Sequence, residues 1–206
     1  MIIALFGGAF DPVHRDHLRI AESAISAGFC DSVWFTPSPD RWDKKPKAPA
    51  QHRVAMLRIA LHGITGMEIR TDELEQNAYR GTYQLLRTLS AERPQDEFRL
   101  LLGADLWQTI PQWRDPEHFD GSNFNGIQLM KEFSLIIFPR RGHPMPDKND
   151  FRLHGFRPPH LFSKDQTRIG VLASSQIRKG KNNPSGDLPE GVWEYIQTNN
   201  LYRSVG

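Results

Sequence analysis

The fold of this chain is decided by residues 7–18, which read Gly-Gly-Ala-Phe-Asp-Pro-Val-His-Arg-Asp-His-Leu. An apolar run at residues 2–6, rich in strand-favouring side chains, comes directly before them. After them, apolar residues recur at helical spacing from Leu18 to Ile25, until Gly28 supplies a stop signal. The order of strand, glycine turn and helix predicts a phosphate-binding α/β unit, because free N–H groups and the positive end of the helix dipole both point at such a turn.

Two histidines follow the glycines. His14 and His17 are three residues apart, so both can face one side as the chain enters the helix. Near a polyphosphate, their imidazoles could donate N–H hydrogen bonds to oxygens that gain charge in a transition state. A metal pair and two surface histidines are the alternatives. A metal site usually needs a third protein ligand, and the neighbouring sequence offers no obvious one, so phosphate handling is the prediction.

The same residues resemble the Gly-Gly-x-Phe-Asp-Pro-x-His-x-Gly-His signature of the HxGH nucleotidyltransferases. These enzymes join a nucleotide or a phosphate ester to ATP or CTP. The resemblance implies catalytic roles for His14 and His17 and an ATP-binding role for the residues of the turn, namely Gly7, Gly8, Ala9 and Phe10. Asp16 stands where the signature has glycine. Beside bound phosphates, its carboxylate would add bulk and repulsion.

Length, charge and cysteine content narrow the class of protein. The 206 residues fit one domain, so we predict a single nucleotidyltransferase domain over 1–206. A net charge of +2 with dispersed basic residues argues against a nucleic-acid partner. Cys30 is the only cysteine of the sequence, which excludes an internal disulfide, and its neighbour Phe29 favours a buried thiol. With no membrane-length apolar run and no signal-like start, we expect a cytoplasmic protein without a membrane partner.

Strand-like and helix-like segments alternate along the chain. Further strands are expected at 32–36, 67–70, 98–102, 133–138 and 167–172. Helices are expected at 51–62, at 82–89 with Thr82 as its cap, and at 188–199. Residues 71–75 and 144–159 read as loops. The alternation predicts an α/β fold, a Rossmann-like doubly wound parallel sheet with helices on both faces, and ligands at the carboxyl ends of the strands.

A lysine-rich loop at 40–47 follows the second expected strand and so lies on the ligand side of the sheet. The resemblance implies that a lysine of this loop contacts the ATP phosphates. Lys44 is the first choice and Lys45 is nearly as good. The alternative is a solvated surface loop.

Two segments resemble the nicotinate- and nicotinamide-mononucleotide adenylyltransferases in particular. Gly103-Ala104-Asp105 is followed by a short helix and Trp113, and Thr82-Tyr83 resembles a helix start of that branch. The resemblance implies a pyridine-nucleotide site with Thr82, Tyr83 and a stacking Trp113, and ATP contacts by Gly103 and Asp105. A helix cap for Asp105 and a core position for Trp113 are the alternatives.

Two later turns complete the resemblance. Arg140, in Pro-Arg-Arg-Gly after the 133–138 strand, is implied to contact the adenosine; a surface arginine is the alternative. Residues 172–178, Leu-Ala-Ser-Ser-Gln-Ile-Arg, resemble the family's Ile-Ser-Ser-Thr-x-Ile-Arg. Ser174 and Ser175 at a helix start and Arg178 one turn later could form an anion cradle, with Arg178 in a catalytic role.

The resemblance therefore implies a nicotinate-nucleotide adenylyltransferase of NAD biosynthesis. It would join ATP and nicotinate mononucleotide to give the deamido-NAD dinucleotide and pyrophosphate, with Mg²⁺ carried by ATP and no protein metal site. Nicotinamide mononucleotide or another phosphate ester as acceptor, and a nucleotide-binding sensor without turnover, are the alternatives. Residues 115–131, rich in glycine and asparagine, fit a lid, an insertion or an oligomer contact. The sequence therefore does not decide whether the protein forms a homo-oligomer.

Overall fold

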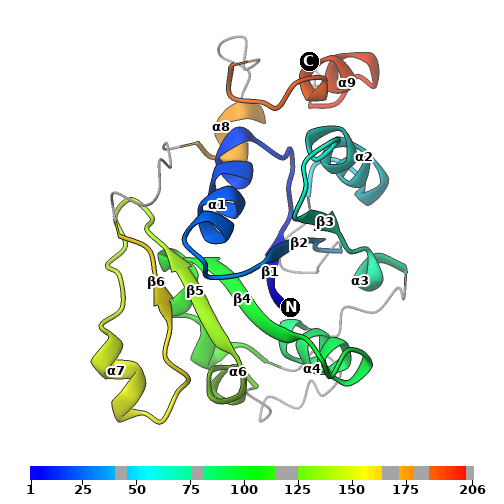
Figure 1. Cartoon of the computed structure of the whole chain (residues 1–206). Coiled ribbons are helices and arrows are strands. Elements are labelled where there is room, and N and C mark those ends of the chain that lie inside the picture. The colour runs from blue at the N-terminus through cyan, green and yellow to red at the C-terminus, as the bar shows by residue number, and fades with distance from the viewer. Residues whose placement is uncertain (40–45, 76–80, 115–124, 164–171, 179–185, 203–206) are drawn as a thin grey trace.

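Strand β1 (Ile2–Gly8) lies inside a parallel sheet of six strands, with the order β3-β2-β1-β4-β5-β6 (Figure 1). The computed structural model describes residues 1–39, 46–75, 81–114, 125–163, 172–178 and 186–202. The other strands are β2 (Ser32–Pro37), β3 (Met67–Ile69), β4 (Glu97–Gly103), β5 (Ser134–Phe138) and β6 (His160–Leu161). The predicted doubly wound parallel sheet is confirmed.

The strand order reverses between β1 and β4. Phe6 of β1 pairs with Phe35 of β2 on one side and with Leu101 of β4 on the other. From β1 the chain winds outward through β2 and β3, then returns to β4 and winds the opposite way through β5 and β6. Ligands of such sheets bind beyond the carboxyl ends of the strands at this reversal. The turn after β1 and the Gly103 segment after β4 both begin there.

Alternate side chains of the strands enter two apolar cores, one on each face. Ala4 and Phe6 of β1 join the first core, whereas Ile3 and Leu5 join the second. The first core is covered by α1 (Arg15–Ser26), α2 (Ala50–Ala60), α8 (Ser174–Arg178) and α9 (Val192–Thr198). The second is covered by α4 (Thr82–Glu92), α6 (Gly126–Glu132) and α7 (Lys148–Leu153). Figure 1 shows these two groups on opposite sides of the sheet.

Two predicted loops contain short helices. In 144–159, helix α7 is capped by Asp147, whose carboxylate accepts the Asn149 N–H at 2.8 Å, and Phe151 anchors it in the second core. In 71–75, the structure has helix α3 (Asp72–Glu75). Both loop predictions were therefore wrong at these residues. Among the described residues, the helices are too short and too polar for any of them to traverse a bilayer.

Two helix starts differ from the prediction. Helix α4 is capped by Gly81 at a φ of 81°, so Thr82 is its first residue and not its cap. Helix α9 begins at Val192 instead of 188, because Gly191 adopts a left-handed φ of 76° directly before it. Glycine reaches this region without the steric cost that a Cβ brings.

The last strand of the sheet was predicted at the wrong place. Strand β6 pairs with Ile136 and Ile137 of β5, and its two residues are too few to show an alternating pattern. The expected strand at 167–172 lies outside the described residues except for Leu172, which is not in a strand.

Part of the segment 115–131 belongs to the fold itself. Residues 126–131 lie in α6, whose Leu129 and Met130 are buried in the second core. A Cβ on Gly126 would lie 1.6 Å from the Ile110 carbonyl oxygen, in the 3₁₀ turn η1 (Ile110–Gln112). Glycine is therefore required for α6 to pack on η1, so residues 126–131 are part of the core and not a mobile lid, while an oligomer contact by this segment stays a prediction. Residues 115–124 lie outside the described part of the chain.

Cys30 lies between α1 and β2, two residues before the strand, with 4% of its surface exposed. Burial raises the pKa of its thiol to about 11. The predicted buried structural thiol is confirmed.

Candidate functional site

The turn after β1 folds an aromatic ring back onto its own glycines. Phe10 has a positive φ of 47° and is 2% exposed. A Cβ on Gly8 would lie 3.1 Å from the Phe10 ring, so glycine gives this ring its room. Phe10 in turn packs edge-on against Phe6 at 5.7 Å and against His17 at 5.1 Å between ring centroids. The aromatic contacts therefore fix His17 relative to the turn.

His14 and His17 form a stacked pair at the start of α1. Their ring centroids are 3.6 Å apart at an interplanar angle of 23°. The backbone N–H of His14 donates to Nδ1 of His17 at 3.1 Å. Since Nδ1 accepts this bond, the tautomer assigned to neutral His17 carries its proton on Nε2, which is then available to donate to a ligand oxygen.

Both histidines are held neutral near pH 7. Burial lowers the pKa of His14 to about 4, with Asp16 opposing and Arg140 adding to this effect. Burial also lowers the pKa of His17 well below 6.5, and the charges of His14 and Arg140 act in the same direction. A neutral imidazole has one N–H donor, so the pair offers hydrogen bonds to a ligand without a fixed positive charge.

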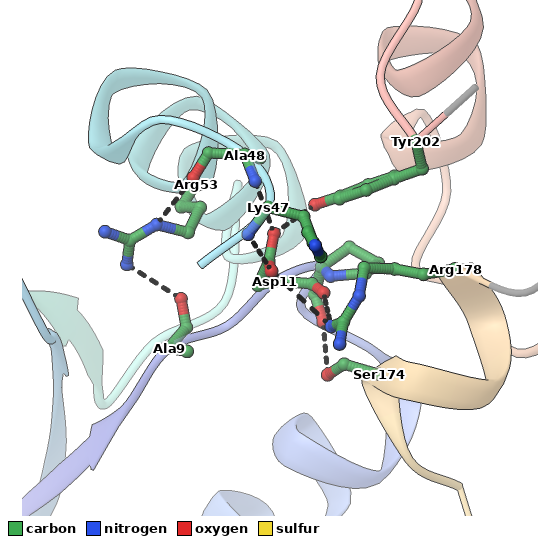
Figure 2. A network of polar contacts seen from close by, with 9 residues as sticks. Ala9, Asp11, Lys47, Ala48, Arg53, Ser174, Arg178 and Tyr202 are labelled. Carbon is green, nitrogen blue, oxygen red and sulfur yellow. Dashed lines mark hydrogen bonds and ion pairs between the residues drawn. The ribbon is translucent and has the colours of Figure 1, made fainter. Parts of the chain in front are cut away.

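The carboxylate of Asp11 joins four parts of the chain (Figure 2). It accepts the backbone N–H groups of Lys47 at 2.7 Å and Ala48 at 3.0 Å, and the hydroxyl of Tyr202 at 2.8 Å. Arg178 Nη1 lies 3.5 Å from the same carboxylate. Burial and the Asp11 charge raise the pKa of Tyr202, so its hydroxyl stays protonated and donates. Asp11 is 3% exposed, and these donors compensate its buried charge.

Arg53 of α2 also connects the turn after β1 to the residues that precede α2. It is fully buried, and its guanidinium donates to the carbonyl of Ala9 at 2.9 Å and to that of Ala48 at 3.1 Å (Figure 2). Asp11 and Arg53 therefore tie the residues before α2 to the turn after β1. The loop with the predicted Lys44 leads into these residues, but Lys44 and Lys45 themselves lie outside the described residues.

The structure brings the serine–arginine motif onto the first turn. Ser174 Oγ donates to the carbonyl of Pro12 at 2.9 Å, and Arg178 Nη1 donates to the carbonyl of Asp11 (Figure 2). The predicted contact between the two motifs, which are more than 160 residues apart, is confirmed. Ser175 is exposed on the same short helix.

Asp16 does not project as the sequence suggested. One carboxylate oxygen accepts the N–H of Leu172 at 3.3 Å and the other pairs with Arg19 Nη1 at 3.1 Å. The residue is 1% exposed. Its carboxylate is directed to the segment before α8, so the expected bulk and repulsion toward phosphates do not follow from this placement.

Gly103, Asp105 and Arg140 meet at the carboxyl ends of β4 and β5. Asp105 Oδ1 lies 3.6 Å from Arg140 Nε, and a Cβ on Gly103 would lie 2.3 Å from that same oxygen. Glycine at 103 therefore makes room for the carboxylate. In the described part of the chain, neither of these two buried atoms has a hydrogen-bond partner. The positive charge of Arg140 adds to the burial that lowers the pKa of His14 and His17.

The predicted pyridine-binding residues lie along the second core. The Tyr83 ring is 7% exposed and packs against Phe133, and its hydroxyl donates to Glu132 at 2.9 Å. Trp113 packs against the same core and its indole N–H donates to Thr109 Oγ1 at 3.0 Å. Both rings are thus held by protein contacts, and their role toward a pyridine ring stays a prediction.

No cluster of metal ligands accompanies this site in the ranges that the structure describes: no three His, Cys, Asp or Glu side chains are placed to hold one ion. The site instead combines two neutral histidines with the guanidinium groups of Arg140 and Arg178. These are donors that suit anionic oxygens. Asp11 and Tyr202 are site residues for which no role was predicted from the sequence.

Comparison with known proteins agrees with this geometry. Residues 5–180 match the family model described as cytidylyltransferase-like. The chain belongs to that family. A Streptococcus pneumoniae protein named "Probable nicotinate-nucleotide adenylyltransferase" is 35% identical over 207 residues, covering 97% of this chain and 88% of its own. A Listeria monocytogenes protein of the same name is 29% identical over 202 residues, covering 97% and 96%.

Solved structures of two complexes share the fold. Nicotinic acid mononucleotide adenylyltransferase of Plasmodium falciparum, complexed with NaAD, superposes with a TM-score of 0.76 over 98% of this chain and 97% of its own. Its sequence identity is 24%, so this likeness supports the fold. The same protein complexed with APC gives a TM-score of 0.75 at 22% identity, over 98% and 96% of the two chains.

Proposed function

We propose that this protein is a nicotinate-nucleotide adenylyltransferase, which joins ATP and nicotinate mononucleotide to give deamido-NAD and pyrophosphate. The observation that carries the proposal is the direct contact between the histidine turn and the serine–arginine helix at the reversal of the strand order. The names of the relatives that cover almost the whole chain give the same reaction. Gly7, Gly8, Ala9 and Phe10 would border the ATP.

The reaction needs positioning and charge stabilisation more than proton transfer. A phosphate oxygen of the mononucleotide, already ionised, attacks the α-phosphorus of ATP. A new P–O bond forms, the bond between the α-phosphorus and the bridging oxygen breaks, and pyrophosphate leaves with that electron pair. No general base is required. His17 would donate from Nε2 to phosphate oxygens that gain charge, with His14 stacked behind it.

Arg178 would steady the departing pyrophosphate together with Lys44, Ser174 and Ser175. The Arg178 side chain is 26% exposed and its guanidinium is held by Asp11, so other N–H groups of the guanidinium can donate to an anion while this contact is kept. The approach of a polyphosphate would also raise the pKa of both histidines from their low values, because a nearby negative charge favours the protonated imidazole.

Mg²⁺ would be carried by the nucleotide. Two carboxylates of the site, Asp11 and Asp16, already accept hydrogen bonds from N–H and O–H donors, and Asp105 lies 3.6 Å from the Arg140 guanidinium, which leaves all three poor candidates for binding an ion. Mg²⁺ favours phosphate oxygens and water, and bound there it neutralises part of the charge that the transition state develops.

The other predicted site residues would contact the ribose, the adenosine and the pyridine ring. Asp105 would accept ribose hydroxyl groups and Gly103 would border the ribose, while Arg140 would contact the adenosine. Thr82, Tyr83 and Trp113 would line the pyridine-ring site. We place the reaction in the cytoplasm, where ATP is available.

Pyrophosphate release tests the proposal. The purified chain is incubated with Mg²⁺-ATP and, separately, nicotinate mononucleotide, nicotinamide mononucleotide or phosphopantetheine. We expect release with nicotinate mononucleotide above the others, and a dinucleotide product of matching mass. ATP binding without release in any of the three mixtures would contradict the proposal and favour a nucleotide sensor.

A further inference from the structure

Asp16 makes two contacts that the glycine of the family signature cannot make. Its Oδ2 accepts the Leu172 N–H at 3.3 Å, and its Oδ1 lies 3.1 Å from Arg19 Nη1. The residue is buried, with 1% of its surface exposed. A hydrogen bond from an N–H group to an ionised carboxylate is stronger than one between neutral groups. This bond joins the start of α1 to the residue two positions before Ser174.

The bond completes a set of three ties between the same two segments. Ser174 and Arg178 reach from α8 to the carbonyls of Pro12 and Asp11. Asp16 reaches in the opposite direction, from the first motif to the backbone before α8. Because α8 has only five residues, its position depends on the segments that flank it. The Asp16 contact fixes the segment on its amino-terminal side.

The neighbouring charge explains why a carboxylate is tolerated so close to the histidines. Arg19 pairs with it in the i,i+3 arrangement, from a side chain that is 47% exposed. The positive charge of Arg19 offsets the negative charge of the Asp16 carboxylate. The pairing also directs Oδ1 along the helix, while Oδ2 points to Leu172.

We propose that Asp16 is a positioning residue: it holds the segment before α8 against α1, so that Ser174 and Arg178 are preset for the phosphates of ATP. This proposal depends on the proposed function, because it takes ATP as the ligand of Ser174 and Arg178. The sequence alone predicted that the Asp16 carboxylate would repel bound phosphates, and this proposal gives it the opposite effect on ATP binding. Restoring the glycine of the signature, D16G, weakens ATP binding where a repulsive carboxylate would predict tighter binding.

The test compares four variants of the full chain. D16G and D16A remove both contacts, D16N keeps an oxygen that accepts the Leu172 N–H, and E22Q is the control because Glu22 is an exposed carboxylate on the same helix. We expect D16G and D16A to raise KM for ATP and Kd for Mg²⁺-ATP about tenfold, with kcat changed less than threefold. D16N should raise them about threefold, and E22Q should match the original protein.

Amide hydrogen exchange supplies a readout that does not depend on turnover. We expect faster exchange at Leu172 and along residues 174–178 in D16A, and a rate in D16N near that of the original protein. Unchanged exchange and unchanged ATP affinity in D16A, or tighter ATP binding by D16G, would overturn the proposal. If no mononucleotide supports pyrophosphate release, the proposed function fails, yet the Kd for ATP and the exchange rates still decide the role of Asp16.

Discussion

His17 is the side chain on which the proposed chemistry depends most. The Phe10 ring and His14 hold its imidazole in place, and the bond from the His14 N–H leaves Nε2 as the free donor. A donor fixed in this way costs no reorganisation when charge develops on a phosphate. Binding of the pyridine nucleotide does not draw on this donor.

We therefore expect H17A to lower kcat about 100-fold while Kd for nicotinate mononucleotide changes less than threefold. Steady-state pyrophosphate release gives kcat and calorimetry gives Kd. H62A is the matched control, because His62 is exposed beyond the end of α2. Equal losses in kcat and in mononucleotide affinity would contradict the role of His17.

His14 predicts a dependence of stability on pH. Its pKa is about 4 in the folded chain, against an ordinary value of 6.5. Between these values the unfolded chain binds more protons, so the free energy of unfolding rises with pH. The free energy of unfolding is therefore highest above pH 6.5, where His14 is neutral in both states. It falls as the pH drops to about 4, because only the unfolded chain binds the proton, a change of about 3 kcal/mol for His14 alone.

Urea denaturation at a series of pH values measures this effect. The H14N variant, which does not titrate in this range, should show a smaller loss of stability between pH 6.5 and pH 4 than the original protein. Parallel curves for the two proteins would show that His14 is not buried in its neutral form.

Helix α6 depends on one glycine. The Cβ position of Gly126 lies 1.6 Å from the Ile110 carbonyl oxygen, so G126A forces α6 away from η1. We expect G126A to lower the free energy of unfolding by at least about 3 kcal/mol, although alanine favours helix more than glycine. G186A is the control, because nothing lies within 4 Å of the Cβ position of Gly186. A loss below 1 kcal/mol in G126A would contradict this packing.

Elements with strong local patterns were predictable, and those fixed by distant contacts were not. The strand at 2–6 and the helix from Leu18 carry their own periodicity, so the unit around the first turn was correct. Helix α7 has six residues and depends on Phe151 packing against Trp107 and Phe156, contacts that no local pattern encodes. Strand β6 is shorter still.

The candidate site shows the same division. The glycines, histidines and serine–arginine motif stand in recognisable runs of sequence. Asp11 also stands in such a run, but its partners come from residues 47, 48, 178 and 202, and only the folded chain reveals them. Asp16 was read from its type and position alone, and the fold directs its carboxylate toward Leu172.

The last turn of the described chain contacts the turn after β1 at the site. Tyr202 donates to Asp11 across 191 positions of sequence, and β1 at the beginning of the chain shares its core with α9. We propose that residues 1–206 form a single domain, since the sheet and both groups of helices share continuous cores. The last turn of the chain is then part of the support of the nucleotide site.

Y202F tests this arrangement. Without the hydroxyl, the Asp11 carboxylate loses one donor and pairs more strongly with Arg178, so we expect about 2 kcal/mol lower stability and a KM for ATP raised about threefold. Y195F is the control, because Tyr195 lies on α9 and its hydroxyl contacts His52. Lower stability with unchanged KM in Y202F would limit Tyr202 to a structural role.

The buried thiol of Cys30 makes this protein convenient for fluorescence work. With a pKa of about 11, roughly one thiol in ten thousand is ionised at pH 7, and the side chain is 4% exposed. Maleimide dyes should therefore leave the native protein unlabelled. A cysteine in place of Gln176, an exposed residue of α8, would carry a single dye without prior removal of Cys30. The arrival of ATP could then be followed in real time.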